Sequence, residues 1–153
     1  MTGEPAPTLV IGIGNPSRGD DALGPLLLKG LASLALPGVE LLEDYQLQVE
    51  FLLDLDGRER VVFVDASVAG DAPFRFSHAG PLPDAGYTSH ALAPEVVLAA
   101  YARHFGRPPP PAWILGIRAY GFELGDDLSP EAAANLAAAQ EFLTGWLVRQ
   151  RVP

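Results

Sequence analysis

Three side chains of this chain have the types needed for a shared catalytic or metal-binding site: Asp21, Asp65 and His90. They are too far apart in sequence to form a local metal-binding motif, so only a fold that gathers strand ends would bring them together. Two carboxylates and one imidazole suit a borderline divalent ion, such as nickel or zinc, with coordination positions left open. The same set could orient a water molecule for hydrolysis.

Each of the three side chains also has a simpler structural explanation. An aspartate at the start of a helix, such as Asp20 or Asp21, caps free N–H groups and complements the helix dipole. One cap is enough for a helix, so from spacing alone cap and site are equally good interpretations of Asp21. Asp65 could bind nearby loop N–H groups, and His90 could be a structural histidine. A covalent hydrolase is harder to build, because the sequence holds no cysteine and shows no base paired with Ser17 or Ser67.

The first loop, from Gly12 to Asp21, is rich in glycine but does not match a nucleotide-binding motif. A dinucleotide fingerprint would require glycine at position 17, where Ser17 stands, and the phosphate-binding P-loop requires a lysine that this loop lacks. Gly12 and Gly14 allow either a close backbone approach to a ligand or simply a tight turn.

The elements that would position these residues alternate between strand and helix. Asp65 directly follows a continuous β-branched and aromatic run, which is the clearest strand signal in the chain, and the β-branched run at 8–13 predicts a strand buried on both faces. Strands are expected at 8–13, 38–42, 61–64, 74–76 (an edge strand) and 112–117, and helices at 21–34, 47–55, 93–105 and 129–149. This order predicts one α/β domain over residues 1–153, with three α/β/α layers and a mostly parallel sheet of about five strands. Ligands bind such sheets beyond the carboxyl ends of the strands.

Composition narrows the possible partners and locations. The 153 residues, 48% of them apolar, suffice for one domain with a sizeable core. A net charge of −9 argues against a nucleic-acid partner, and the absence of cysteine excludes disulfides and thiolate metal sites. The N-terminus lacks the features of a signal peptide, and no apolar run is long enough to span a membrane. We therefore expect a cytoplasmic monomer that contacts no membrane.

Three motifs together resemble the hydrogenase maturation proteases, which process the large subunit of nickel–iron hydrogenases. They are Gly12-x-Gly-Asn-x-x-x-x-Asp-Asp21-x-x-Gly24, then Val-Phe-Val-Asp65-Ala, then Ser89-His90-x-Leu92. The resemblance covers the chain from about Leu9 to Leu147, and all three motifs occur in the family's order. The chain departs from the family pattern in two places. Some members have Glu in place of Asp21, which changes the reach of the side chain but not its charge, and many are glycine-rich where this chain has Glu43-Asp-Tyr-Gln-Leu47, a segment that concerns recognition of the substrate.

The resemblance implies an endopeptidase that removes a short C-terminal extension from a hydrogenase large-subunit precursor after nickel has been inserted. It implies that Asp21, Asp65 and His90 contact nickel that the substrate supplies, with no organic cofactor, and that these three residues are catalytic. The expected substrate-contacting residues are Gly12, Gly14, Asn15, Gln46 and Glu50. Asp21 is the first candidate for assisting water attack, and metal-assisted attack remains an alternative.

Two other functions remain open from sequence. A non-catalytic chaperone could bind the metallated precursor with the same three ligands and leave it at full length. Peptidyl-tRNA hydrolases also open with a strand and Gly-x-Gly-Asn-Pro, as at residues 12–16 here. Their Thr-Arg-His-Asn signature is replaced by Asp-Asp-Ala-Leu-Gly at 20–24, and an acidic chain suits tRNA poorly.

Overall fold

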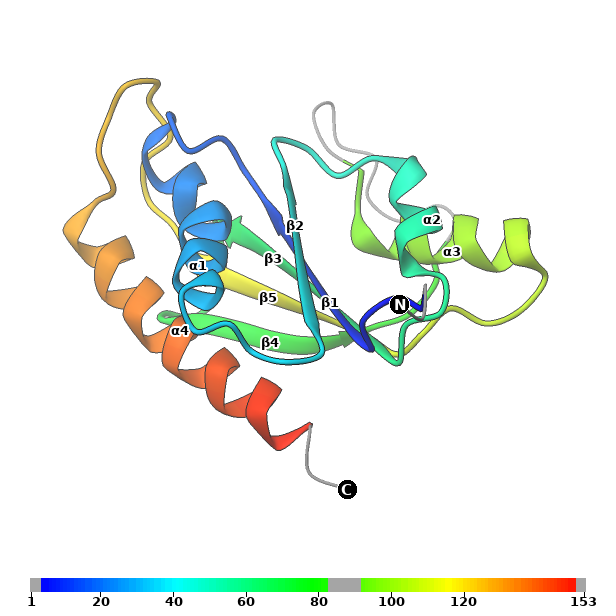
Figure 1. Cartoon of the computed structure of the whole chain (residues 1–153). Helices are drawn as coiled ribbons and strands as arrows, with labels where there is room; N and C mark the ends of the chain where they lie inside the picture. Colours follow the sequence, from blue (N-terminus) through cyan, green and yellow to red (C-terminus); the bar gives the residue numbers. More distant parts are fainter. Residues whose placement is uncertain (1–3, 83–91, 151–153) are drawn as a thin grey trace.

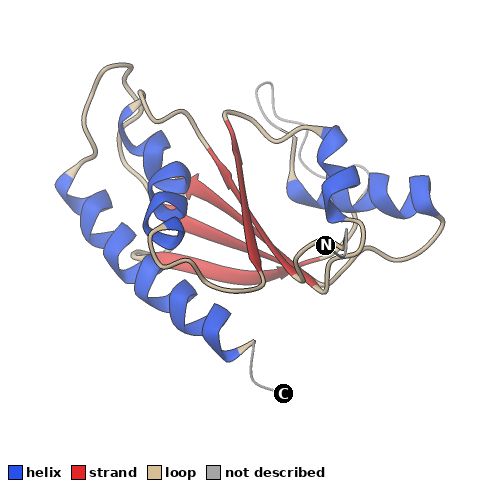
Figure 2. Cartoon of the chain, viewed as in Figure 1, coloured by secondary structure: helices blue, strands red, loops and turns tan. Residues whose placement is uncertain are grey.

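The computed structural model describes residues 4–82 and 92–150, which form a sheet with helices on both of its faces (Figures 1 and 2). The strands are β1 (Thr8–Ile13), β2 (Val39–Asp44), β3 (Arg60–Ser67), β4 (Phe74–Ala79) and β5 (Ala112–Arg118). The α-helices are α1 (Leu23–Ala32), α2 (Leu52–Leu55), α3 (Pro94–Phe105) and α4 (Pro130–Arg149), with short 3₁₀-helices at Gly19–Ala22 and Val49–Phe51.

The sheet has the order β2-β1-β3-β5-β4, in which β4 alone runs antiparallel to its neighbour. The central strands β1 and β3 are apolar and buried on both faces, as parallel strands covered by helices must be. β2 and β4 form the two edges. The predicted α/β/α fold with a mostly parallel sheet is therefore confirmed.

Alternation along the strands divides the core into two clusters. Val10, Val62 and Val64 face α1 and α4, which cover one side of the sheet. Leu9, Ile11 and Phe63 point to the opposite side, where they join side chains of α2 and α3. Because successive strand residues alternate between faces, Asp65 lies on the same side as Phe63, beyond the end of that second cluster.

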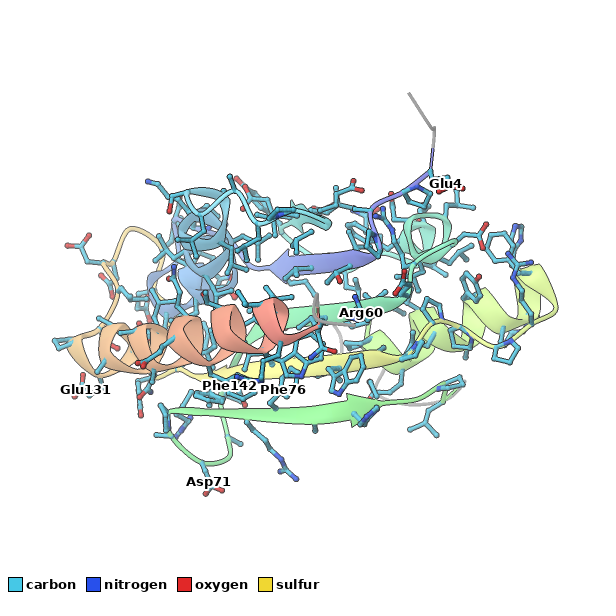
Figure 3. All side chains as sticks on the ribbon, turned by 60° about the horizontal axis from the view of Figure 1, so that its bottom comes forward. Glu4, Arg60, Asp71, Phe76, Glu131 and Phe142 are labelled. Carbon is cyan, nitrogen blue, oxygen red and sulfur yellow. The ribbon has the colours of Figure 1, made fainter. Side chains whose placement is uncertain are left out.

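The antiparallel edge is held by aromatic packing. The Phe76 ring meets Phe142 of α4 edge-on at 4.9 Å between centroids, and Trp146 of the same helix at 5.4 Å. Figure 3 shows Phe76 and Phe142 together between the strand and the helix. These contacts explain why a short strand that follows Pro73 stays on the sheet.

Several predicted boundaries are corrected by the structure. The helix expected at 21–34 begins as the 3₁₀-helix Gly19–Ala22 and ends as α1 at Ala32. The helix expected at 47–55 is a 3₁₀ turn followed by one turn of α-helix. β3 continues to Ser67, so Asp65 lies within the strand rather than after it. No helix among the described residues is long and apolar enough to cross a membrane.

Gly24 is the residue that lets α1 approach the sheet closely. A Cβ atom at this position would lie 2.5 Å from the carbonyl oxygen of Ile13 and 3.0 Å from that of Val64. Both neighbours are backbone atoms of central strands and cannot move aside easily. We therefore expect Gly24→Ala to lower the free energy of unfolding by about 1–3 kcal/mol in urea denaturation. A control, Gly121→Ala, has nothing within 4 Å of its Cβ and should be close to wild type; equal stability of the two variants would contradict this account.

Candidate functional site

Asp21 and Asp65 come together at the carboxyl end of the sheet. Asp21 follows β1 through the loop and the 3₁₀-helix, and Asp65 stands near the end of β3. Both line a hollow of about 280 Å³, together with Ile13, Asn15, Arg18, Tyr45 and Gln46. The structure thus brings these two predicted residues to one hollow, and their role there stays a prediction.

Asp65 is set apart by its protonation behaviour. Burial, with a smaller contribution from the negative charge of Asp21, raises the pKa of this carboxyl from its usual 3.8 to about 7. The N–H of Ala66 donates to Asp65 Oδ1 at 2.7 Å and opposes the rise only in part. A carboxyl with a pKa near neutrality can give or accept a proton at physiological pH, and an approaching cation would stabilise its ionised form.

The raised pKa implies a pH-dependent cost in stability. Because the folded protein holds the Asp65 proton more tightly than the unfolded chain, stability falls as the pH rises from about 4 to 7, and the full cost is present above 7. Asn resembles protonated Asp and can still accept from Ala66. We therefore expect Asp65→Asn to match wild type near pH 4 and to exceed its free energy of unfolding by about 1–3 kcal/mol at pH 8.

Denaturation in urea at the two pH values measures this difference. Asp71→Asn, in the exposed turn before β4, is the matched control because it removes the same charge without burial (Figure 3). An Asp65→Asn variant that is less stable than wild type at pH 8 would contradict the burial argument.

The loop before Asp21 fixes that carboxylate in place. The Asn15 N–H donates to Asp21 Oδ2 at 2.8 Å, and the side chain of Asn15 accepts from the Ser17 N–H at 2.9 Å. Gly14 has a φ of 145°, and a Cβ there would lie 2.0 Å from the Asp21 carbonyl oxygen. Gly14 and Asn15, both expected to contact substrate, therefore hold the Asp21 backbone and carboxylate in position.

Asp20 has a different role from its neighbour. Only 1% of Asp20 is exposed, and its carboxylate accepts from the Tyr120, Gly121 and Ser129 N–H groups and from the Ser129 hydroxyl, at 2.7–3.1 Å. Burial alone would raise the pKa of Asp20, but these hydrogen bonds outweigh it and lower the pKa. The prediction that Asp20 caps the following helix is wrong: Asp20 instead ties the first loop to the segment between β5 and α4.

The remaining predicted residues are placed as follows. Gln46 lines the hollow, whereas Glu50 is exposed on the 3₁₀-helix Val49–Phe51 and is not among the lining residues. Gly12 is buried beneath α1, where a Cβ would lie 2.7 Å from Leu28 Cδ1, so its small size serves helix packing. His90 lies outside the described residues, and its part in the site stays a prediction.

Two lining residues were not singled out from sequence. Arg18 lines the same hollow as the two carboxylates, and Tyr45, which directly follows β2, is 63% exposed. Arg18 occupies a variable position inside the first motif, so the motif gave no reason to select it. Tyr45 lies in the segment that departs from the family pattern, and that departure was the available signal.

Among the described residues, the side chains at this hollow that could coordinate a metal ion through carboxylates are those of Asp21 and Asp65. No group of three metal-binding side chains occurs within residues 4–82 and 92–150. Carboxylate oxygens suit hard and borderline divalent ions, and two of them leave most of a coordination shell open.

The comparisons with known proteins bear on the fold. No protein-family model matches the chain, and no curated protein matches its sequence. Among solved structures, the hydrogenase maturating endopeptidase HybD from E. coli matches with a TM-score of 0.75 and 23% identity, over 94% of this chain and 93% of that one. This chain has the fold of the hydrogenase maturation proteases.

Two archaeal structures agree with this assignment. The [NiFe] hydrogenase maturation protease HycI from Thermococcus kodakarensis KOD1 matches with a TM-score of 0.68 and 25% identity, over 93% of this chain and 92% of that one. A hydrogenase 2 maturation peptidase from a Thaumarchaeota archaeon matches with a TM-score of 0.66 and 24% identity, over 92% and 97%. The predicted resemblance to this protease family is therefore confirmed at the level of the fold.

Proposed function

We propose that this protein is an endopeptidase that removes the C-terminal extension of a nickel–iron hydrogenase large-subunit precursor after nickel insertion. The observation that carries the proposal is the Asp21–Asp65 carboxylate pair at the carboxyl end of a sheet with the maturation-protease fold. The nickel belongs to the substrate in this proposal. Asp21 and Asp65, with His90 as the third expected ligand, complete a coordination shell to which the precursor contributes its own ligands.

The chemistry required of the chain is hydrolysis of one peptide bond. A water molecule adds to the scissile carbonyl carbon, and an ionised carboxylate accepts the proton that the water loses. The C–N bond then breaks, and the same proton passes to the leaving amine, so that a new carboxylate and a new amine result. Asp21, fixed by Asn15, is the proposed base, and Asp65 with its pKa near 7 can support the proton transfer.

The surroundings of the hollow suit a protein substrate better than a small molecule. Large apolar side chains are exposed on the loops that follow three of the parallel strands. They are Tyr45 after β2 (63% exposed), Val68 after β3 (70%), and Tyr120 and Leu124 after β5 (47% and 74%). Exposed apolar groups gathered at one end of a molecule are typical of a protein-docking surface. We expect the chain to meet its precursor in the cytoplasm as a monomer.

Intact mass spectrometry of a nickel-loaded large-subunit precursor, incubated with this protein, tests the proposal. The expected result is one shorter product and one C-terminal peptide whose masses sum to that of the precursor plus one water. The second candidate, a chaperone that binds through the same carboxylates, predicts a stable complex by size-exclusion chromatography and a precursor of unchanged mass.

A further inference from the structure

A groove runs along one side of the molecule between helix α1 and edge strand β2. Its widest part encloses about 550 Å³ and is lined by Pro25, Leu28 and Ala32 from the helix and by Leu41 and Glu43 from the strand. Most of the lining is apolar. Such a surface, left uncovered beside the sheet, is suited to binding apolar side chains.

The groove is continuous with the candidate site. Toward the amino end of β2 it shares Ala32 and Leu41 with a neighbouring hollow of about 250 Å³. Toward the carboxyl end it shares Pro25 and Glu43 with a hollow of about 200 Å³. That last hollow shares Tyr45 with the hollow that contains Asp21 and Asp65, so the groove reaches the site around the end of β2.

The helix side of the groove follows from helical periodicity. Pro25, Leu28 and Ala32 recur at intervals of three and four residues, which places them on one side of α1. Ala32 is the exposed residue at the carboxyl end of this row. A small exposed residue beside larger apolar ones leaves room for a side chain from another polypeptide.

The strand side offers backbone hydrogen bonds. β2 pairs with β1 alone and is the last strand of the sheet at this edge, beside α1 (Figure 1). Its outer N–H and C=O groups have no strand partner among the described residues. The alternate residues Val39, Leu41 and Glu43 point toward α1, because Leu41 is in register with Val10 on that side.

We propose that the substrate segment next to the scissile bond binds as an added strand along β2, with alternate apolar side chains in the groove beside α1. This inference rests on the proposed function and specifies how the same site binds the substrate's polypeptide chain. Strand addition supplies backbone hydrogen bonds for affinity, and pockets for every second side chain supply specificity. Since β2 has six residues and a strand rises about 3.3 Å per residue, the edge can hold about five or six substrate residues.

An endopeptidase has a physical reason to use such an arrangement. The candidate site is a small hollow of about 280 Å³ around two carboxylates, which can hold one peptide bond but cannot fix the register of an extended chain. A strand paired with β2 is held in a defined register by its backbone and leads past Tyr45 to Asp21 and Asp65.

Filling the groove tests the inference through the kinetics of precursor processing. Ala32→Trp should occupy the groove and raise KM by about tenfold or more, with kcat within about threefold of wild type. Ser33→Trp is the matched control, since Ser33 is the exposed neighbour at the end of the same helix and does not line the groove. Its KM should stay within about twofold of wild type.

Hydrogen–deuterium exchange measures directly whether the backbone amides of β2 become protected when the precursor binds. When wild-type protein is mixed with nickel-loaded precursor and pulse-labelled before the first turnover is complete, the amides of Val39–Asp44 should exchange more slowly than in the protein alone. If wild type cleaves but Ala32→Trp matches Ser33→Trp and β2 exchange is unchanged, this inference alone is wrong. If wild type neither cleaves nor binds the precursor, the proposed function and this inference fail together. A stable dimer with protected β2 amides before any precursor is added would assign the edge to a second copy and overturn the inference.

Discussion

Asp21→Asn is expected to lower the rate of precursor processing by about 10³-fold or more while leaving the fold intact. The substitution removes the charge that accepts a proton from water and that binds the substrate's metal. The asparagine side chain keeps one oxygen that can still accept a hydrogen bond from the Asn15 N–H. In the wild-type protein this N–H lies 2.8 Å from Asp21 Oδ2. The free energy of unfolding should therefore stay within about 0.5 kcal/mol of wild type.

Single-turnover processing assays with a nickel-loaded precursor measure the rate, and urea denaturation of the same preparation measures the stability. Processing by Asp21→Asn at the wild-type rate would remove this carboxylate from the mechanism. A variant that is inactive because it is unfolded would show a lowered free energy of unfolding. The stability measurement therefore distinguishes loss of the catalytic carboxylate from loss of the fold.

Asp20→Asn, the same substitution one residue earlier, should have its main effect on stability. Asp20 is 1% exposed and its two oxygens accept four hydrogen bonds, whereas the amide of Asn has only one accepting oxygen. Buried N–H groups of the β5–α4 segment would then face an amide that donates rather than accepts. We expect the free energy of unfolding to fall by about 3–5 kcal/mol at pH 7.

The pH dependence of the free energy of unfolding provides a control for the Asp20→Asn prediction. The folded state lowers the pKa of Asp20, so its stabilising effect is present above the usual carboxyl pKa of 3.8 and is lost as the pH falls through the lower folded value. The stability gap between wild type and Asp20→Asn should therefore narrow at strongly acidic pH. Equal stability of the two proteins at pH 7 would contradict the structural role, and processing activity per folded molecule should stay close to wild type.

This pair of aspartates shows what sequence reasoning can and cannot resolve. The motif placed both residues at the start of a helix, where local rules favour capping for either of them. The partners of Asp20 lie about a hundred residues away, in the segment that leads into α4. No local pattern reports a contact over that distance, so the assignment of Asp20 to structure and Asp21 to the site required the fold.

Strongly patterned elements were predictable, because their apolar runs and helix-start signals determine their structure locally. β1 matches its expected bounds, and α4 begins at Pro130 with Ser129 accepting from the Ala132 N–H. The segment at 47–55 was misread since its leucines have helical spacing but only one turn of it is α-helix. Arg18 and Tyr45 were missed because a site contact made by an exposed loop residue leaves no periodic trace.

The proposed activity has the carboxylate pair act on a metallated precursor and hydrolyse one peptide bond. The most direct test compares matched nickel-loaded and nickel-free precursor, each incubated with wild-type protein in ¹⁸O-labelled water and followed by intact mass spectrometry. Only the nickel-loaded form should be cleaved, with one ¹⁸O in the new C-terminal carboxylate of the large product. Equal cleavage of both forms would contradict the recognition of substrate nickel. A nickel-loaded precursor that stays at full length would contradict the protease itself.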